Sequence, residues 1–266
     1  MSTTPSSEPS LSPADSAQVE AIAPGFELLL NRTLASAGLQ LSDAALRQLA
    51  QHAAMVQIWN QRFNLTALTQ PQDIVALHFM DSLTALPVLQ EEQARFEQVL
   101  QVIDVGTGAG FPGIPLKVAL PSLRLWLLDG TAKKVRFCAA VIKALGLREV
   151  WAIHGRAEEL ARTARREQFD VAIARAVAPL PTLVEYLLPL IRVGGLCIAM
   201  KGSEAQLELE QAQRAIGVLG GAPEAVRPVQ LPDRADRRAL VLIRKQRPTP
   251  PTYPRPAGAP RRSPLV

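Results

Sequence analysis

The chain has 266 residues, enough for one large domain or for a domain with a smaller partner, and its 48% of hydrophobic residues excludes global disorder. The formal net charge of +5 favours an anionic partner such as RNA, but a mildly basic balance is common and is weak evidence alone. Cys138 and Cys197 are the only cysteines, which excludes a disulfide framework and is typical of a reduced, cytoplasmic protein.

The N-terminal segment MSTTPSSEPSLSPADSAQ lacks the apolar core of a secretory signal, and no window approaches the roughly 18 uninterrupted apolar residues of a membrane span. We therefore expect a soluble cytoplasmic protein with no membrane partner, and a monomer. Residues 1–24 are rich in Ser, Pro and Ala and are predicted to be a disordered arm.

Residues 25–97 are predicted to form a helical N-terminal subdomain. From Ser42 to Phe63, in SDAALRQLAQHAAMVQIWNQRF, apolar residues recur at spacings of three or four and form one helical face. Ser42 suits the N-cap, and Asp43 favours the helix dipole in the first turn. The stretch DIVALHFMDSLTALPVL is a further helical pattern, expected to end near Pro87.

Residues 98–246 alternate between apolar strand patterns and helical patterns. Helical stretches separate the first six strands, which indicates strand–helix–strand units and a parallel sheet covered on both faces. The connection PDRADRR is too short for a helical crossover, so the last two strands should form a hairpin with one antiparallel strand. The predicted strands are Val99–Val105, Leu123–Leu128, Val150–His154, Phe169–Ala174, Gly195–Met200, Ala225–Leu231 and Ala239–Arg244.

The last segment, residues 247–266, is Pro-rich and basic and is predicted to be extended and mobile in the free protein. On RNA it could fold, with Tyr253 stacking on bases and Arg255, Arg261 and Arg262 binding phosphates. Its deletion should then weaken RNA methylation and leave cofactor affinity intact.

The stretch VIDVGTGAGFPGIPL, from Val102 to Leu116, has the form of a ligand loop between a strand and a helix. Its glycines, Gly106, Gly108 and Gly110, would let the backbone approach a ligand. The third position of the dinucleotide fingerprint holds Phe111, so the fit to a pyrophosphate is poor, and no Gly-Lys-Ser/Thr of a P-loop follows. A tight strand-to-helix turn without a ligand is the alternative interpretation.

Two acids favour S-adenosylmethionine as the ligand of this loop. Asp104, two residues before the first glycine, would repel a phosphate and attract a cationic amino acid that carries a sulfonium. Asp129 ends the second predicted strand, where an acid can accept hydrogen bonds from both ribose hydroxyls of an adenosine.

Several stretches in chain order resemble the ribosomal RNA small-subunit methyltransferase G family, also called glucose-inhibited division protein B. The resemblance covers residues 64–260 and leaves out the N-terminal arm. The matching stretches are NLTAL (64–68), HFMDSL (78–83), DVGTGAGFPGIPL (104–116), LLDGTAKKVRF (127–137), GRAEEL (155–160), RAVAPL (175–180), MKG (200–202) and YPRPAGAP (253–260).

The resemblance implies an α/β fold: a Rossmann-like class I S-adenosylmethionine-dependent methyltransferase domain, with a seven-stranded, mostly parallel sheet and the helical N-terminal subdomain. It implies methylation of guanine N7 in 16S rRNA of the small ribosomal subunit, at the guanosine of position 527 in the 530 loop. Guanine N7 has a free in-plane lone pair, so the transfer needs alignment and no general base, and positioning alone can contribute roughly 7–11 kcal/mol.

Other methylations fit less well. Attack by cytosine C5 needs a cysteine nucleophile, whereas Cys138 and Cys197 have the patterns of small core residues. Enzymes that methylate exocyclic amines usually carry Asn/Asp-Pro-Pro-aromatic after the fourth strand, where this chain has ARAVAPLP. A class I methyltransferase for another RNA, a protein or a metabolite, and a non-catalytic ribosome-assembly factor, remain as alternatives. No Cys/His spacing suggests a metal.

Arg175 and Lys201 each follow a predicted strand, at the edge of the sheet where ligands bind. With the resemblance, we assign Arg175 to cofactor and target positioning and Lys201 to RNA phosphate or target contact, both as catalytic candidates. The resemblance also implies cofactor contacts from Gly106, Phe111, Asp129, Gly130, Thr131, Ala157 and Glu158. The family often has Ser where this chain has Gly130, so a side-chain contact is not expected there.

Lys133, Lys134 and Arg136 open a predicted helix, where cations oppose the helix dipole. RNA phosphate binding is one reason for such residues, and a solvated helix face is the other. His78 could donate to RNA or hold the helical layer on the sheet, and we favour the structural role.

Overall fold

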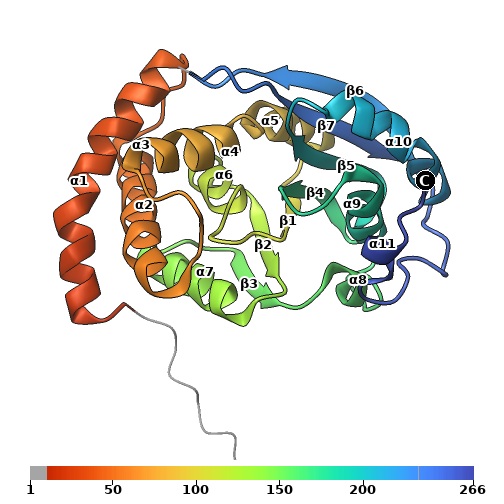
Figure 1. The fold of residues 1–266 in the computed structure, drawn as a ribbon, viewed down its shortest axis with the longest axis horizontal. Helices are drawn as coiled ribbons and strands as arrows, with labels where there is room; N and C mark the ends of the chain where they lie inside the picture. Colours follow the sequence, from red (N-terminus) through yellow and green to blue (C-terminus); the bar gives the residue numbers. More distant parts are fainter. Residues whose placement is uncertain (1–10, 233) are drawn as a thin grey trace, which may run out of the picture.

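The computed structural model describes residues 11–232 and 234–266, which fold into a seven-stranded sheet with helices on both faces (Figure 1). The strand order is β3-β2-β1-β4-β5-β7-β6. The strands are β1 (Gln101–Val105), β2 (Arg124–Asp129), β3 (Val150–His154), β4 (Phe169–Arg175), β5 (Ile191–Lys201), β6 (Gly221–Val229) and β7 (Arg238–Lys245).

The sheet confirms the predicted topology. Strands β1 to β5 pair in parallel, and β7 lies antiparallel between β5 and β6. The reversal of strand order lies between β1 and β4, and doubly wound sheets bind ligands outside the carboxyl ends of the strands at such a point. The fold therefore directs attention to the residues that follow β1, β2, β4 and β5.

Each face of the sheet carries its own apolar core. One core lies against the N-terminal helices, α6 and α7, and the other against α8, α9 and α10. The N-terminal helical elements are α1 (Pro13–Ser36), α2 (Asp43–Phe63), α3 (Pro71–Ile74), η1 (Val75–Met80), α4 (Asp81–Leu83) and α5 (Leu86–Phe96). Those of the sheet domain are α6 (Gly113–Ala119), α7 (Ala132–Ala144), α8 (Ala157–Leu160), α9 (Leu180–Leu187), η2 (Leu188–Leu190), α10 (Ala205–Val218) and α11 (Ala259–Arg262).

Within the N-terminal helices, α2 matches its predicted start, because Ser42 caps it and accepts from the Ala45 N–H at 3.3 Å. The second predicted helix is interrupted where Pro87 was expected to end it. A π-helical turn, η1, lies in its middle, and α4 ends at Leu83. A new helix, α5, then begins with Pro87 in its first turn, where proline is well tolerated.

The predicted disordered arm, residues 1–24, is wrong for the part from Pro13 onward, which is the first half of α1. Ser12 caps this helix, and Pro13 stands in its first turn. Val19 is 6% exposed and packs with the helical core, so the arm gains apolar burial that its composition did not suggest. Residues 1–10 lie outside the described residues.

The C-terminal segment 247–266 packs on the sheet domain, which corrects the prediction of a mobile tail. Its end runs past α8 and α9 into α11 (Figure 1). Arg166 donates to the carbonyls of Thr249 and Tyr253, each at 2.7 Å. Arg255 forms a close ion pair with the fully buried carboxylate of Glu185, at 2.6 Å. Specific polar partners therefore hold a segment whose composition resembles a linker.

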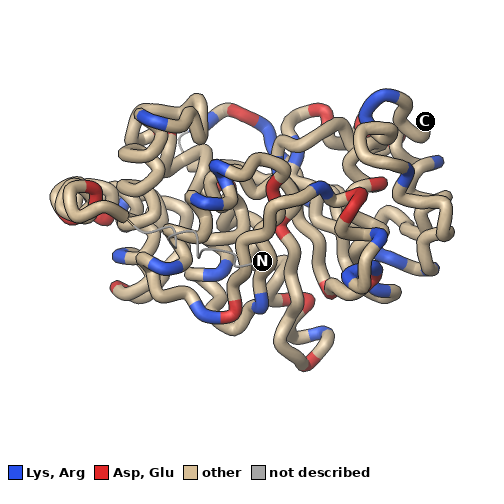
Figure 2. The backbone as a smooth tube through the Cα atoms, turned by 90° about the horizontal axis from the view of Figure 1, so that it is seen from below, with Lys and Arg blue, Asp and Glu red and all other residues tan. Residues whose placement is uncertain are grey.

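The charged residues are distributed over the molecule. Lys and Arg are spread along the tube, with Asp and Glu between them (Figure 2). Among the described residues, no helix combines the length and apolar character that crossing a bilayer requires.

Candidate functional site

The glycine-rich loop follows β1 and takes the shape that its glycines allow. Gly106, Gly108 and Gly110 have φ values of +73°, +60° and +86°, in the left-handed region that favours glycine. A Cβ on Gly110 would lie 2.3 Å from Cδ1 of Ile114, whereas a Cβ on Gly108 would meet no atom within 4 Å. The backbone at Gly108 is therefore open to an incoming group.

Asp104 fixes the glycine-rich loop through two hydrogen bonds. Its Oδ2 accepts from the Thr107 hydroxyl at 2.6 Å and from the Gly113 N–H at 2.9 Å. Burial is the largest influence on this carboxyl and raises its pKa to about 6. Its Oδ1 is buried and has no hydrogen-bond partner among the described residues. Asp104 thus lies under the loop and is fully buried, although the sequence suggested a ligand contact.

Asp129 ends β2 beside the loop, as the pattern of acids predicted. Its Oδ2 accepts from the Gly108 N–H at 3.0 Å, and its Oδ1 accepts from the Thr131 N–H at 2.8 Å. Each carboxylate oxygen keeps a second lone pair that can accept from a hydroxyl. Gly130 is exposed next to it. The structure therefore brings together Gly108, Asp129, Gly130 and Thr131.

Phe111 is buried among aromatic rings. Its ring stacks against His78, with centroids 4.5 Å apart, and against His52, with centroids 4.8 Å apart. The guanidinium carbon of Arg175 lies 5.4 Å from the centroid of the same ring. A ligand contact from Phe111 would therefore use its backbone, because these groups enclose its ring.

The two histidines stay neutral, with fixed roles. His52 lies within 2.8 Å of the Ala109 carbonyl, which fixes its Nε2 as the donor, and burial lowers its pKa to about 4. His78 Nδ1 accepts from Arg175 at 2.9 Å, so its Nε2 carries the hydrogen toward Thr66. Burial and the nearby guanidinium lower the pKa of His78 to about 3. His78 thus joins the helical layer to the sheet.

Ala157 and Glu158 begin α8, after β3. Both are buried, and Oε1 of Glu158 accepts from the Gly258 N–H at 3.0 Å. The Glu158 side chain is therefore engaged by the C-terminal segment. We accordingly expect that segment to support the cofactor side of the site, contrary to the expectation that its deletion would leave cofactor affinity intact.

A second group of charged residues surrounds a cavity of 240 Å³ at the carboxyl ends of β4 and β5. Arg175 donates to Asp81 at 2.8 Å and to the Leu77 carbonyl at 2.7 Å. Lys201 donates to Glu208 at 2.6 Å and to the Ala178 carbonyl at 2.7 Å. The structure thus places the two catalytic candidates on one cavity.

This architecture agrees with a match to a known family. The family model for rRNA small subunit methyltransferase G matches residues 45–237. The chain belongs to this family.

Relatives in the family span nearly the whole chain. The ribosomal RNA small subunit methyltransferase G of Symbiobacterium thermophilum is 44% identical, over 91% of this chain and 99% of its own. That of Desulfitobacterium hafniense is 42% identical, over 90% and 98%. Among solved structures, the precorrin-6y C5,15-methyltransferase of Geobacter metallireducens is similar at a TM-score of 0.44 and 14% identity, covering 61% of this chain and 88% of that one.

Of the remaining RNA-binding candidates, three lie in α7 and one lies in the C-terminal segment. Lys133, Lys134 and Arg136 stand in the first turns of α7, and Arg136 is exposed. These positions leave both phosphate binding and a solvated face open. Arg255 is different, because its backbone N–H and guanidinium both bind the Glu185 carboxylate. We no longer expect Arg255 to be free for an RNA phosphate.

Four residues of the site were missed by sequence analysis. His52, Asp81, Glu208 and Arg238 were not among its candidates. Asp81 lies in the HFMDSL stretch, which was a usable signal. Glu208 and Arg238 lie on α10 and at the start of β7, and their local patterns resemble ordinary surface charges.

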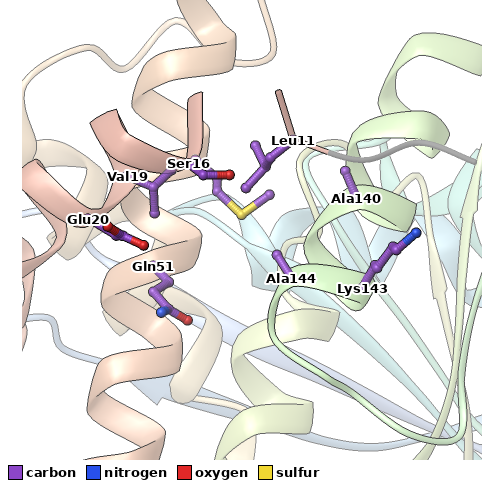
Figure 3. Close-up of a pocket in the computed structure, with 9 residues that line it drawn as sticks. Leu11, Ser16, Val19, Glu20, Gln51, Ala140, Lys143 and Ala144 are labelled. Carbon is purple, nitrogen blue, oxygen red and sulfur yellow. The ribbon is translucent and has the colours of Figure 1, made fainter. Parts of the chain in front are cut away.

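Other features of the described chain carry less chemistry. A larger pocket of 310 Å³ lies between α1, α2 and α7 and contains none of the predicted site residues (Figure 3). Cys138 and Cys197 are buried, which agrees with their interpretation as core residues, and burial raises the pKa of both thiols. Residues 11–232 and 234–266 hold no group of His, Cys, Asp and Glu arranged for a metal.

Proposed function

We propose that the protein transfers a methyl group from S-adenosylmethionine to N7 of a guanosine in 16S rRNA of the small ribosomal subunit. The observation that carries this proposal is the pairing of the Asp129-bound glycine loop with a cation-lined cavity at the ends of β4 and β5. The family supports the reaction class, since its members are named as methyltransferases of small-subunit ribosomal RNA.

The loop has the properties that an adenosine cofactor needs. Gly108 leaves open space where a side chain would stand, and its N–H is held by Asp129. Asp129 would accept from the ribose hydroxyls, and the backbone at Gly106, Gly110 and Ala157 would line the rest of the cofactor site. When bound, S-adenosylmethionine supplies an electrophilic methyl group on a positively charged sulfur.

The side chains of the protein then have to orient the guanine base, and they do not have to remove a proton from it. Guanine N7 carries a lone pair and no proton, so its attack on the methyl carbon forms the N–C bond as the C–S bond breaks. No side chain has to accept a proton in this step. Arg175 is well placed for orientation, because Asp81, the Leu77 carbonyl and His78 fix its guanidinium at 12% exposure. Rigid positioning of this kind contributes through alignment.

The finer features of the proposal concern the target and its setting. We propose the guanosine at position 527 of the 530 loop as the target, a cytoplasmic location and a monomeric enzyme. Lys133, Lys134 and Arg136 would add phosphate contacts, whose strength falls with rising salt.

The experiment that tests the function measures methyl transfer from labelled S-adenosylmethionine to small subunits from a strain that lacks this protein. Deproteinised 16S rRNA serves as the second substrate, and cleavage at N7-methylguanosine maps the label. A single N7-methylguanosine at position 527 is the expected result. Label at another base or in a protein would replace this function with another methyl transfer. Cofactor binding without label would indicate a non-catalytic assembly factor.

The cofactor site is tested separately through Asp129→Ala. Loss of the carboxylate removes the ribose acceptor and leaves the N–H groups of Gly108 and Thr131 without their partner. We expect cofactor affinity, measured by calorimetry, to fall by about 1–3 kcal/mol. An unchanged affinity in a folded variant would contradict the assignment of Asp129.

A further inference from the structure

The edge strand β3 carries an exposed tryptophan. All three tryptophans of the chain lie in its described part, and Trp151 is the exposed one, at 40%. β3 is the last strand on one side of the sheet, so no further strand covers Trp151 from outside (Figure 1). A single exposed apolar residue is ordinary on a protein surface, so only the surroundings of Trp151 can give it a role.

Trp151 is the outer member of an aromatic stack. Trp126 of β2 is its register partner, and the two rings stack with centroids 4.4 Å apart and 28° between their planes. Trp126 in turn meets the ring of Phe169 on β4, at 5.2 Å and 73°. Trp126 and Phe169 are buried. The stack therefore begins in the core and ends at the sheet edge with an accessible indole, on which one more flat ring can stack.

Two arginines border this stack. Arg165 is exposed, its guanidinium carbon lies 5.4 Å from the Trp126 ring centroid, and it forms no ion pair with any described residue. Arg124 lies two residues before Trp126, on the same face of β2, and pairs with Glu149 at 3.0 Å. Both members of this pair are 53% exposed, so the pair contributes little stability and Arg124 remains available to a second anion. These three charges leave one net positive charge beside the rings.

We propose that Trp151 stacks on an unpaired base of the substrate RNA, while Arg124 or Arg165 binds a neighbouring phosphate. These two arginines, Trp126 and Trp151 together form what we call the β3-edge surface. The inference rests on the proposed function only in taking RNA as the substrate, and it adds a binding surface outside the reaction site. The cavity at the ends of β4 and β5 contains none of these residues.

An RNA strand matches both features of the β3-edge surface. Its unpaired bases are flat rings that stack on aromatic side chains, and each base is joined to a phosphate that attracts arginine. An apolar peptide would cover the indole and leave the cations without a partner. A second copy of this chain would bring the same net positive charge against this one. Charge complementarity therefore favours RNA as the occupant.

The β3-edge surface is separate from the Asp129 end of the sheet. Trp151 stands three residues before His154, which is the register partner of Asp129. At about 3.3 Å per residue, roughly 10 Å of strand separate the two. A base on Trp151 would therefore hold the RNA without touching the cofactor site. Its loss should raise the KM for RNA and leave kcat and cofactor affinity unchanged.

The test compares Trp151→Leu with Trp151→Phe in the full-length enzyme. Both variants keep apolar surface at the sheet edge, but only phenylalanine keeps an aromatic face for a base. Val193→Ala, which also shortens an exposed apolar side chain, is the control. Binding of deproteinised 16S rRNA from a strain that lacks this protein is measured by filter retention and by tryptophan fluorescence. Methylation kinetics, calorimetry with S-adenosylmethionine and thermal unfolding use the same preparations.

We expect Trp151→Leu to raise the dissociation constant and the KM for RNA about tenfold, within the range of about 5- to 150-fold that one stacked base contributes. Its kcat and its cofactor affinity should stay within about twofold of the wild type. Trp151→Phe should bind RNA within about threefold of the wild type and lose most of the fluorescence change. Val193→Ala should bind as the wild type does.

Arg165→Ala tests the phosphate contact and keeps the inference testable if Trp151→Leu melts. The slope of log affinity against log salt concentration should become shallower by about 0.7, the contribution of one phosphate of a single strand. An unchanged slope would remove Arg165 from the RNA contact.

Three outcomes would overturn the inference. Wild-type RNA affinity in Trp151→Leu, or equal losses in the leucine and phenylalanine variants, would exclude base stacking. A loss with small subunits but not with deproteinised RNA would assign the surface to a ribosomal protein. Self-association of the wild type that Trp151→Leu abolishes would assign it to a second copy. If the wild type methylates no rRNA, the proposed function fails, whereas an active wild type beside an unaffected Trp151→Leu defeats this inference alone.

Discussion

The glycine loop after β1 and the cavity at the ends of β4 and β5 are built in different ways. In the loop, carboxylates hold backbone N–H groups: Asp104 holds Gly113, and Asp129 holds Gly108. In the cavity, carboxylates hold long cationic side chains from other elements, as in Arg175–Asp81 and Lys201–Glu208. One surface has its shape fixed by the main chain, and the other by side chains.

With the proposed function, this difference would divide the tasks between the two halves of the site. A main-chain surface offers fixed N–H groups at little cost in side-chain entropy, which suits one constant cofactor. A side-chain surface can change its partners, which suits a target that arrives as part of a larger RNA. Phe111 joins them, because its ring contacts His52 of the loop side and His78 of the cavity side.

The largest effect is expected from breaking the cavity with Arg175→Ala. Its loss leaves the buried carboxylate of Asp81 with the weaker Arg238 contact and frees the Leu77 carbonyl. We expect the free energy of unfolding to fall by about 3 kcal/mol and turnover to fall severely, measured by urea unfolding and by methylation of subunits.

The matched control is Arg192→Ala, at the opposite end of β5, where Arg192 pairs with the buried Asp170. That variant should lose stability and keep its turnover per folded molecule. If both variants lost turnover equally, Arg175 would be a structural residue only.

The next largest effect is expected from Gly110→Ala, which should disrupt the glycine loop. The new methyl would overlap Ile114, at 2.3 Å from Cδ1, and the residue would stand at a φ of +86°. Strain of about 1–2 kcal/mol from the left-handed backbone and about 1–3 kcal/mol from overpacking should lower stability by roughly 3 kcal/mol. Cofactor affinity should fall with it, because Gly110 is part of the loop. If the unfolding and binding curves of Gly110→Ala matched those of the wild type, they would contradict the loop geometry.

Acid should affect both regions through one histidine each. The pKa of His52 is lowered to about 4 and that of His78 to about 3, so the folded protein keeps both neutral while the unfolded chain protonates them near 6.5. Stability from these groups is present above pH 6.5 and is lost as the pH falls. Between pH 7 and pH 5 each should cost about 2 kcal/mol, so His52→Gln should show a flatter pH profile of unfolding than the wild type.

An identical slope in His52→Gln would contradict the buried neutral state. Asp104 acts with the opposite sign, since its raised pKa of about 6 makes its contribution favourable at low pH and lost as the pH rises. Asp104 is present in both the wild type and His52→Gln. Its contribution to stability therefore cancels when their two pH slopes are compared.

The smallest loss of stability is expected from Gly108→Ala, in the same loop as Gly110. Gly108→Ala places a methyl in open space at a φ of +60°, which should cost about 1 kcal/mol of stability. The same methyl would stand where the cofactor approaches the main chain, so its dissociation constant should rise at least tenfold. Unfolding and calorimetry on Gly108→Ala and Gly110→Ala therefore separate folding from binding. Equal binding by Gly108→Ala and wild type would place the cofactor elsewhere.

The sheet and the loop could be predicted because their signals are local. Apolar runs, the glycines and the acids that end strands are contained in short windows, and the short PDRADRR connection was enough to predict the hairpin. The cavity could be predicted only in part. Arg175 and Lys201 are the last residues of their strands, whereas Arg238 and Asp81 are 157 positions apart and meet only in the fold.

The described parts of both terminal segments, from Pro13 to residue 24 and from residue 247 onward, were predicted wrongly for a related reason. Composition indicated disorder, but the partners that order these segments lie far away in sequence. Arg62 of α2 binds Asp15 of α1, and Glu185 of α9 binds Arg255. No local pattern around Asp15 or Arg255 indicates which distant residue binds it.

The C-terminal segment has a consequence for how the protein is made. Glu158 and Glu185 are buried and accept from the backbone of residues 255–258, which the ribosome adds after all seven strands of the sheet. Until these residues emerge, two carboxylates beside the completed sheet lack the groups that compensate their burial. A nascent chain that stops before Arg255 should therefore remain open at α8 and accessible to proteases. The surroundings of α8 then become complete only after residues 255–258 have joined the fold.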